Sequence, residues 1–281
     1  MSEPVLSVHD VVVDYPGRPP TRAVDGVSFD IHTGEVVGLV GESGCGKSTM
    51  ARVLTGLLKP NAGTVIYRGE ELRPLGLGGR APDSTGVQMV FQDPGSSLNP
   101  RRRIGSQIQD GLDAAKRRLG ATDAKDRPQT PQEWLERIGM DPEDAQRYPR
   151  SFSGGQRQRI ATARALAAAP DVLIGDEPIS SLDASTQALI AYVMSTLTIA
   201  QGAGMLFISH DLAVVRLIAD RLLVMYKGRI VERGPAQKIW ADPQHPYTKA
   251  LLGAIPLPDG AQRMPTVTPP GTSYPLDEIV R

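Results

Sequence analysis

Cysteine is almost absent from this chain, with one residue in 281. The chain therefore cannot form an intrachain disulfide or a cysteine-ligated metal or iron–sulfur centre. This scarcity fits a reducing compartment such as the cytoplasm. An excess of charge of one sign is also lacking, because 31 Lys and Arg balance 31 Asp and Glu. The overall charge gives no reason to expect nucleic acid or an anionic membrane as a partner.

Long apolar runs are missing as well. No stretch approaches the ~20 apolar residues of a membrane-spanning helix, and the N-terminal MSEPVLSVHD lacks the basic and apolar regions of a signal peptide. We therefore expect any membrane role to come through a partner. The composition, 40% hydrophobic and 22% charged, is that of an ordinary soluble globular protein. The length predicts one main domain with sub-lobes.

The first third of the chain predicts β-structure followed by one helix. Residues 5–13 and 23–40 have strand patterns, and the second ends in the apolar run 36–40. Apolar residues at helical spacing then predict one buried helix face ending at Lys59-Pro60, made of Met50, Val53, Leu54, Leu57 and Leu58.

The rest of the chain predicts a loop at 73–86, a strand at 87–91 and a charged helical lobe over 101–150. An alternation of helices and strands then resumes, with elements predicted at 154–168, 172–176, 184–200, 205–209, 211–219 and a hairpin at 222–232. Such alternation predicts a mainly parallel sheet covered by helices. Beyond Gly234 the chain is rich in proline with little periodicity, and no further element is predicted there.

A complete phosphate-loop motif lies between the predicted strand 36–40 and the helix after it. The loop comprises Gly41, Glu42, Ser43, Gly44, Cys45, Gly46, Lys47, Ser48 and Thr49. Backbone N–H groups of 42–49 would surround a β-phosphate, Lys47 would neutralise β- and γ-oxygens, and the Ser48 hydroxyl would reach Mg²⁺. The alternative is a glycine-rich turn before a helix, but every fixed position of the motif is present.

Two acids end the predicted strand 172–176. Asp176 suits a water-mediated contact with Mg²⁺, and Glu177 would lie where a carboxylate orients or deprotonates the attacking water. Acids at this point also cap helices, so the phosphate loop gives this pair its meaning.

Three further polar residues follow predicted strands. Gln92 would reach Mg²⁺ or the water, His210 would bond a γ-phosphate, and Tyr15 would stack on adenine. Each has a simpler reading: Gln92 as a polar strand-end residue, His210 with Asp211 as a helix cap, and Tyr15 as packing.

A second helix start suited to an anion lies at 151–159, SFSGGQRQR. A serine cap, two glycines and the helix dipole favour negative charge there. The ordered set of Tyr15, the loop 41–49, Gln92, this stretch with Ser153, Gly154, Gly155 and Gln156, the acids Asp176 and Glu177, the segment 181–183 and His210 resembles the ATP-binding subunit of ABC transporters.

This resemblance implies an α/β P-loop NTPase fold of the ABC type with a mainly parallel sheet, an N-terminal antiparallel β-subdomain and a helical signature subdomain. It implies an ATPase domain over 1–234, with the helical subdomain at about 93–165, and a tail over 235–281. It further implies that two ATPase subunits, identical or homologous, pair head to tail. The signature of one chain and its Asp183 would then close over the ATP and Mg²⁺ held by the other.

The segment 91–101 and the tail motif HPYTKALL at 245–252 are similar to the oligopeptide, dipeptide and nickel branch of ABC importers. That likeness implies two permease subunits, an extracytoplasmic solute-binding protein, and a place at the cytoplasmic face of the membrane. The tail lacks the cysteines that hold an iron–sulfur cluster in some relatives. Departures from the family pattern are Phe152, Gly175 and Ile179, and none removes a functional group.

Other functions fit the sequence less well. A soluble ABC ATPase of DNA repair or translation usually has two ATPase units, coiled coils or zinc inserts, which this chain lacks. An exporter ATPase is disfavoured by the tail and the 91–101 segment. A degenerate ATP site is disfavoured because each catalytic position holds a competent residue. The basic runs 101–103 and 116–118 predict solvated helix faces and no nucleic-acid site.

Overall fold

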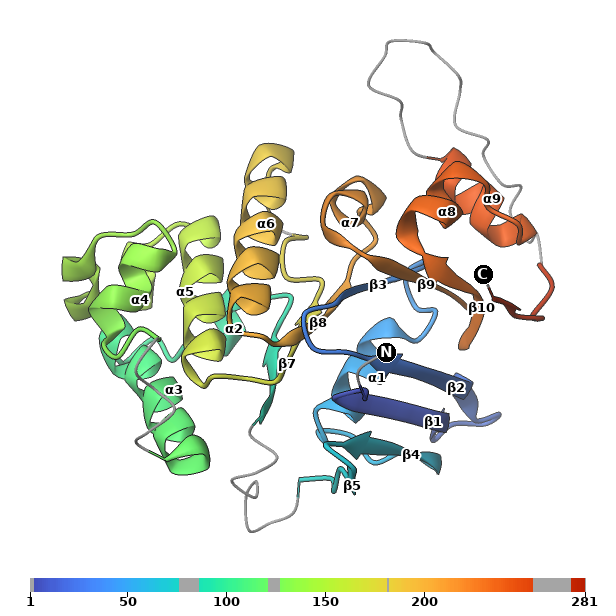
Figure 1. Ribbon diagram of the computed structural model, residues 1–281, viewed down its shortest axis with the longest axis horizontal. Helices are drawn as coiled ribbons and strands as arrows, with labels where there is room; N and C mark the ends of the chain where they lie inside the picture. The colour runs from blue at the N-terminus through green and yellow to red at the C-terminus, as the bar shows by residue number, and fades with distance from the viewer. Residues whose placement is uncertain (1–2, 76–85, 121–126, 181, 255–273, 281) are drawn as a thin grey trace.

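The computed structural model of this chain describes residues 3–75, 86–120, 127–180, 182–254 and 274–280. Two sheets form its centre, and a group of helices lies to one side of them (Figure 1). The smaller sheet is antiparallel with the order β2-β1-β4-β5. Its strands are β1 (Leu6–Tyr15), β2 (Thr21–Ile31), β4 (Ala62–Tyr67) and β5 (Glu70–Glu71).

The larger sheet has seven strands in the order β11-β10-β9-β3-β8-β7-β6. All neighbours are parallel except β9 and β10, which form a hairpin. The strands are β3 (Val36–Val40), β6 (Val87–Val90), β7 (Val172–Asp176), β8 (Gly204–Ile208), β9 (Arg221–Tyr226), β10 (Arg229–Pro235) and β11 (Ile279–Val280). The predicted mainly parallel sheet is therefore confirmed.

Alternate side chains of this sheet enter two separate cores, because successive residues of a strand point to opposite faces. In β3, Val37 and Leu39 pack with the antiparallel sheet and the first helix, whereas Val36 and Val40 pack with the helices of the other face. Strands buried on both faces become continuous apolar runs, as β3 and β8 are.

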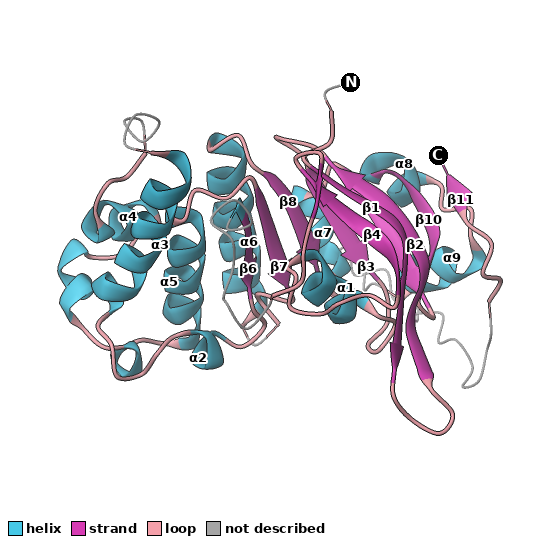
Figure 2. Cartoon of the chain, turned by 90° about the horizontal axis from the view of Figure 1, so that it is seen from below, coloured by secondary structure: helices cyan, strands magenta, loops and turns pink. Residues whose placement is uncertain are grey.

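The helices form three groups. On one face of the large sheet lies α1 (Lys47–Leu54), and on the other lie α6 (Ala184–Ala200) and α7 (Leu212–Ile218). A lobe beside β6 contains α2 (Pro94–Ser97), α3 (Ile104–Leu119), α4 (Pro131–Arg137), the short 3-10 turns η2 (Pro142–Gln146) and η3 (Pro149–Ser151), and α5 (Gly154–Ala167). Figure 2 shows this lobe at the opposite end of the molecule from the antiparallel sheet. Among the described residues, no helix has both the length and the apolar character needed to cross a bilayer.

One half-buried carboxylate joins the three parts of the fold. Asp171, just before β7, forms ion pairs of 2.8 Å with Arg118 at the end of α3 and with Arg68 beyond β4. It also accepts a hydrogen bond from the Tyr67 hydroxyl. The Arg118 side chain is only 4% exposed. The prediction that the run 116–118 is a solvated face is therefore wrong for Arg118, although Lys116 and Arg117 are exposed.

The first predicted helix is shorter than its apolar spacing suggested. The helix α1 ends at Leu54, and the chain then turns at Gly56, whose φ of 69° falls in the left-handed region. Leu57 is consequently 48% exposed instead of completing the buried face.

The tail contains two helices that the sequence reasoning missed. They are α8 (Ala236–Ala241) and α9 (Pro246–Gly253). Both pack near the β9–β10 hairpin, and β11 returns to pair with β10.

Candidate functional site

Four neighbouring parallel strands, β3, β8, β7 and β6, end at one edge of the large sheet. Each is followed by a residue that the sequence singled out: Gly41 after β3, His210 after β8, Glu177 after β7 and Gln92 after β6. The carboxyl ends of parallel strands form the usual ligand crevice of α/β folds. These residues are far apart in the sequence, and the sheet brings them together at one edge.

Close backbone contacts shape the phosphate loop. Gly41 has a φ of 153°, and a Cβ there would lie 2.1 Å from the Met225 carbonyl oxygen. Gly46 has a φ of 114°, and a Cβ there would lie 2.2 Å from the Ala23 carbonyl oxygen. Only glycine fits at these two positions, so the loop can curl tightly between β9 and β2 and present its N–H groups at the start of α1.

The Lys47 side chain is buried against the loop, with 4% of the residue exposed. Its Nζ donates hydrogen bonds of 2.7 Å to the Gly41 carbonyl and 2.8 Å to the Glu42 carbonyl. The ammonium is thus held inside the curve of the loop, where it adds positive charge to the positive end of the α1 dipole. An anionic group is the ligand that this arrangement favours.

Two of the amides expected to face a phosphate have partners within the chain. The Glu42 N–H donates to the Tyr247 hydroxyl at 2.9 Å, and the Cys45 N–H donates to the Glu42 carbonyl at 3.3 Å. Cys45 itself is 8% exposed, and burial raises the pKa of its thiol. A buried, protonated thiol fits the expected role of a small filler better than that of a redox group.

Ser48, in the first turn of α1, donates a hydrogen bond of 2.9 Å from Oγ to Oδ1 of Asp176. Asp176 is 7% exposed, and burial raises the pKa of its carboxyl, with the nearby Glu177 adding to the rise. A hydroxyl and a carboxylate this close together are oxygen ligands of the kind that Mg²⁺ takes alongside phosphates. The residues present therefore fit a magnesium ion.

One carboxylate oxygen gathers the remaining polar residues. Gln92 Nε2 and His210 Nδ1 both lie 3.2 Å from Oε2 of Glu177. Because an ionised carboxylate only accepts hydrogen bonds, Nδ1 carries the proton in this contact. The Glu177 backbone has a φ of 47°, an uncommon conformation for a residue with a side chain. Strain of this kind concentrates at functional sites.

The signature stretch forms the start of α5 in the helical lobe. Ser153 and Gln156 make a reciprocal capping box, in which each side chain bonds the other's backbone N–H. Ser153, Gly154 and Gln156 are exposed. This helix start thus lies on the surface, and Figure 1 shows α5 apart from α1.

Asp183 caps the neighbouring helix α6, because its side chain accepts a hydrogen bond of 3.0 Å from the Thr186 N–H. Ser181 lies outside the described residues.

Tyr15, at the end of β1, is partly buried beside the loop. Its hydroxyl and the Thr49 hydroxyl lie 3.3 Å apart and share a hydrogen bond. The structure therefore places the ring at the edge of the phosphate loop, which is compatible with the expected contact to a base.

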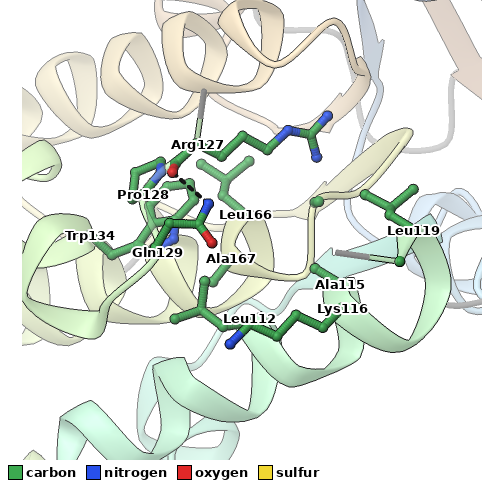
Figure 3. A pocket seen from close by; sticks show the side chains of 12 residues that line it. Leu112, Ala115, Lys116, Leu119, Arg127, Pro128, Gln129, Trp134, Leu166 and Ala167 are labelled. Carbon is green, nitrogen blue, oxygen red and sulfur yellow. Dashed lines mark hydrogen bonds between the residues drawn. The ribbon is translucent and has the colours of Figure 1, made fainter. Parts of the chain in front are cut away.

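A small cavity in the helical lobe lies away from these residues (Figure 3). It has a volume of about 20 Å³ and is lined among others by Leu112, Arg127, Trp134 and Leu166. Within the described part of the chain, the Trp134 indole nitrogen has no hydrogen-bond partner. This space suits one water molecule and not a nucleotide.

A larger groove of about 300 Å³ lies between the large sheet and the helical lobe. Three apolar side chains line it while remaining substantially exposed: Leu57, Leu75 and Phe91, at 48%, 41% and 38%. Arg164 and Asp110 add charge of both signs to its wall. The groove is therefore open to solvent at these three side chains.

Tyr247 is the residue at this site that the sequence reasoning missed. It belongs to the HPYTKALL motif, which the sequence associates with a family branch and with no chemical role. Its sequence position, 205 residues from Glu42, gave no sign of the contact.

Two family models match the sequence. The model described as "ABC transporter" matches residues 24–180. The model described as "Oligopeptide/dipeptide transporter, C-terminal region" matches residues 231–280.

Individual proteins give the same picture. The chain is 49% identical to the oligopeptide transport ATP-binding protein OppF of Bacillus subtilis, over 86% of this chain and 79% of that one. It is 44% identical to the di/tripeptide transport ATP-binding protein DppF of Pseudomonas aeruginosa, over 90% of this chain and 80% of that one. A solved ATP-binding cassette, described as a dimer in a post-hydrolysis state bound to ADP and Pi, superposes with a TM-score of 0.67. That structure is 26% identical, and the match covers 82% of this chain and 98% of the other.

Proposed function

This chain belongs to the ABC transporter family, and we propose that it is the ATP-hydrolysing subunit of a membrane importer for di- or oligopeptides or a related small solute such as nickel. One observation carries the catalytic part of this proposal: the phosphate loop, the acids, Gln92 and His210 meet at one sheet edge. The matching C-terminal region and the two peptide-transport relatives support the choice of solute class.

The triphosphate of ATP would lie against the phosphate loop. Lys47, already held on the inner side of the loop by its bonds to two carbonyls, would direct a further N–H donor toward the β- and γ-oxygens, and the N–H groups from Ser43 to Thr49 would supply more donors. The aromatic ring of Tyr15 would lie against the adenine. The phosphate-loop motif and the burial and hydrogen bonds of Lys47 support this placement of the triphosphate.

Mg²⁺ would be held by Ser48 and, through water, by Asp176, with the Gln92 amide near enough to take part. When bound, the ion would neutralise charge on the β- and γ-phosphates. The hydrogen bond between Ser48 and Asp176 supports this set, because it keeps both oxygens on the same side of the loop.

Glu177 would act as the general base that takes the proton of the attacking water. Gln92 and His210 hold its Oε2 from two different strand ends, which fixes the direction of the carboxylate. His210 is the more exposed partner, with 53% of its side chain accessible against 13% for Glu177. It is therefore free to rotate toward a γ-phosphate while Gln92 keeps Glu177 in place.

The exposed signature would complete the site of a second subunit. Ser153, Gly154, Gly155 and Gln156 offer a helix N-terminus to solvent in this chain, and Asp183 lies at the start of the adjacent helix. In a head-to-tail dimer, this surface would close over the ATP of the partner, which is identical or homologous. ATP would then favour the closed dimer, and hydrolysis with phosphate release would favour the open one.

The groove beside Phe91 would receive a cytoplasmic helix of a permease subunit. Exposed apolar side chains around a 300 Å³ hollow are typical of a helix-in-groove contact. Two such permeases, with a solute-binding protein on the far side, would hold this subunit at the cytoplasmic face of the membrane. No nucleic acid is part of this proposal.

A capture experiment tests the proposal. A tagged Glu177→Gln variant is given Mg-ATP to trap the closed state, native membranes are solubilised gently, and the co-purifying proteins are identified. Two multi-pass permease subunits are the expected partners, and a second ATPase of different sequence would establish a heterodimer. Recovery of soluble nucleic-acid or ribosomal partners alone would overturn the transport function.

A further inference from the structure

The C-terminal tail reaches into the phosphate loop through one side chain. Tyr247, in the first turn of α9, accepts a hydrogen bond of 2.9 Å from the Glu42 N–H onto its hydroxyl. Tyr247 is 1% exposed, so the contact lies inside the protein. A side chain from the second matched region therefore touches the loop of the first.

The peptide unit between Gly41 and Glu42 links this tyrosine to Lys47. Its nitrogen donates to Tyr247, and its oxygen, the Gly41 carbonyl, accepts from Lys47 Nζ at 2.7 Å. A peptide unit is planar, so fixing the direction of its N–H also fixes the direction of its C=O. The tail hydroxyl and the loop ammonium are thus two hydrogen bonds apart, joined by one rigid group.

Buried contacts hold Tyr247 itself. The His245 Nδ1 accepts from the Tyr247 backbone N–H at 3.1 Å, which leaves the proton on Nε2, and Nε2 donates to the Pro275 carbonyl at 3.1 Å. The His245 N–H donates at 3.0 Å to Glu232, whose side chain is fully buried on β10.

The tyrosine ring is fixed by aromatic packing. It lies against the Tyr226 ring with centroids 4.4 Å apart and against the Tyr274 ring with centroids 5.5 Å apart. Because Tyr226 is the last residue of β9, this cluster rests on the large sheet. The hydroxyl therefore reaches Glu42 from a rigid support rather than from a mobile surface chain.

We propose that Tyr247 is a positioning residue of the nucleotide site, which fixes the 41–42 peptide and through it the carbonyl that receives Lys47. The inference rests on the proposed function, because it concerns how that ATP site is built. The tail then sets the shape of the phosphate loop. Loss of the hydroxyl frees the peptide to rotate, and both the ammonium and the adjacent loop amides lose their fixed direction.

The test compares two tyrosine variants of the full chain. Tyr247→Phe keeps the ring and removes the hydroxyl that bonds the loop. Tyr226→Phe removes a hydroxyl of the same cluster, which instead accepts from the Tyr274 N–H at 3.3 Å. We expect Tyr247→Phe to weaken the binding of a fluorescent ATP analogue by about three- to tenfold, the effect of one hydrogen bond. Tyr226→Phe should change it less than twofold.

A double-mutant cycle separates positioning from general stability. In a Lys47→Ala background, the Gly41 carbonyl no longer accepts a hydrogen bond from an ammonium group. Tyr247→Phe should therefore have much less effect on nucleotide affinity there than in the wild type. Equal effects in both backgrounds, or equal losses of affinity in the two tyrosine variants, would overturn the inference. Absence of ATP binding by the wild-type chain would instead overturn the proposed function.

Hydrogen exchange supplies a measurement that needs no variant. The Glu42 amide of the wild-type, nucleotide-free chain should be strongly protected, because its N–H is bonded to a buried hydroxyl. Exchange as fast as that of an exposed loop amide would contradict the positioning role, even if Tyr247→Phe failed to fold.

Discussion

The Ser48 hydroxyl donates a 2.9 Å hydrogen bond to Asp176, although 128 residues of chain separate them. One lies at the start of α1 and the other at the end of β7, and β8 separates β7 from the strand that precedes α1. This hydrogen bond can therefore form only when the sheet and the phosphate loop are folded against each other. The Ser48 hydrogen bond stabilises the ionised carboxyl, as do the nearby charges of Arg52 and Lys47, although burial still raises the pKa of Asp176.

Replacing Asp176 by Asn should separate stability from magnesium binding. Burial disfavours the ionised carboxyl in the folded state, so removing the charge should leave the Tm of the nucleotide-free protein unchanged or higher at pH 7. The added stabilisation by Mg-ATP should fall sharply. Thermal unfolding with and without Mg-ATP measures both effects.

The pH dependence provides the control for that variant. The folded pKa of Asp176 lies above its ordinary value of 3.8, because burying the ionised carboxyl destabilises the folded state. As the pH falls through the folded pKa, the carboxyl becomes protonated and the wild type is no longer destabilised in this way. The stability difference between the variant and the wild type should therefore shrink on acidification. A difference that grows in acid would contradict the assigned direction of the shift.

Replacing Glu177 by Gln should leave ATP binding intact and lower turnover by about a hundred- to ten-thousandfold, the range of a lost general base. Steady-state phosphate release and equilibrium binding of an ATP analogue measure the two quantities. His210→Ala is the matched comparison, because Glu177 keeps its bond to Gln92 there and turnover should fall less. Near-normal hydrolysis by Glu177→Gln would remove the base assignment.

Replacing Gly154 by Asp should test whether the signature serves another subunit. Outside the first turn of α5, the nearest atom to a Cβ at this position is a Leu182 methyl at 3.7 Å, and an acid at a helix start is favourable. The Tm and ATP binding should therefore stay normal, whereas hydrolysis should fall more than tenfold through repulsion of the partner's phosphate. Gly154→Ala, which adds no charge, should be milder.

The thiol of Cys45 should react slowly and its adduct should block nucleotide binding. Burial raises its pKa above the usual 9.0, so little thiolate exists at neutral pH, and the alkylation rate should still be rising above that value. As the sole cysteine, it gives a clean label whose incorporation mass spectrometry can follow. Normal ATP binding by fully alkylated protein would show that the thiol does not lie in the nucleotide site.

Replacing Arg118 by Ala should destabilise the protein by about 3 kcal/mol, because it removes a buried partner of Asp171. Arg117→Ala, one residue earlier on the exposed face of α3, should be nearly neutral. Urea unfolding of both variants measures the difference. Equal stabilities would mean that Arg68 and the Tyr67 hydroxyl together satisfy Asp171.

The local patterns that the sequence predicted well are the long or strongly apolar ones. The strand 172–176 and the helix 184–200 end where their patterns end. The tail helices were missed because α8 and α9 have six and eight residues, too few turns for a periodic pattern. A proline at the first position of α9, after a capping His245, was the available signal.

Contacts between distant segments mark the limit of what the sequence could predict. The residues after four strands could be expected at one sheet edge, because parallel strands share their carboxyl edge. The run 116–118 could not show which basic side chain points inward, since consecutive helical residues face different directions. Nothing local to Tyr247 or Glu42 indicates that they touch, and that contact depends on the folded tail.

The strand order also has a consequence for how the chain is made. The strand that carries the phosphate loop, β3, lies between β8 and β9, which end at residues 208 and 226. During synthesis from the N-terminus, β3 therefore leaves the ribosome with neither neighbour, and it must wait while the whole helical lobe emerges. The antiparallel sheet, complete by residue 71, can shelter its apolar residues during that interval. A nascent chain should consequently gain the capacity to retain nucleotide only after its hairpin and tail have followed.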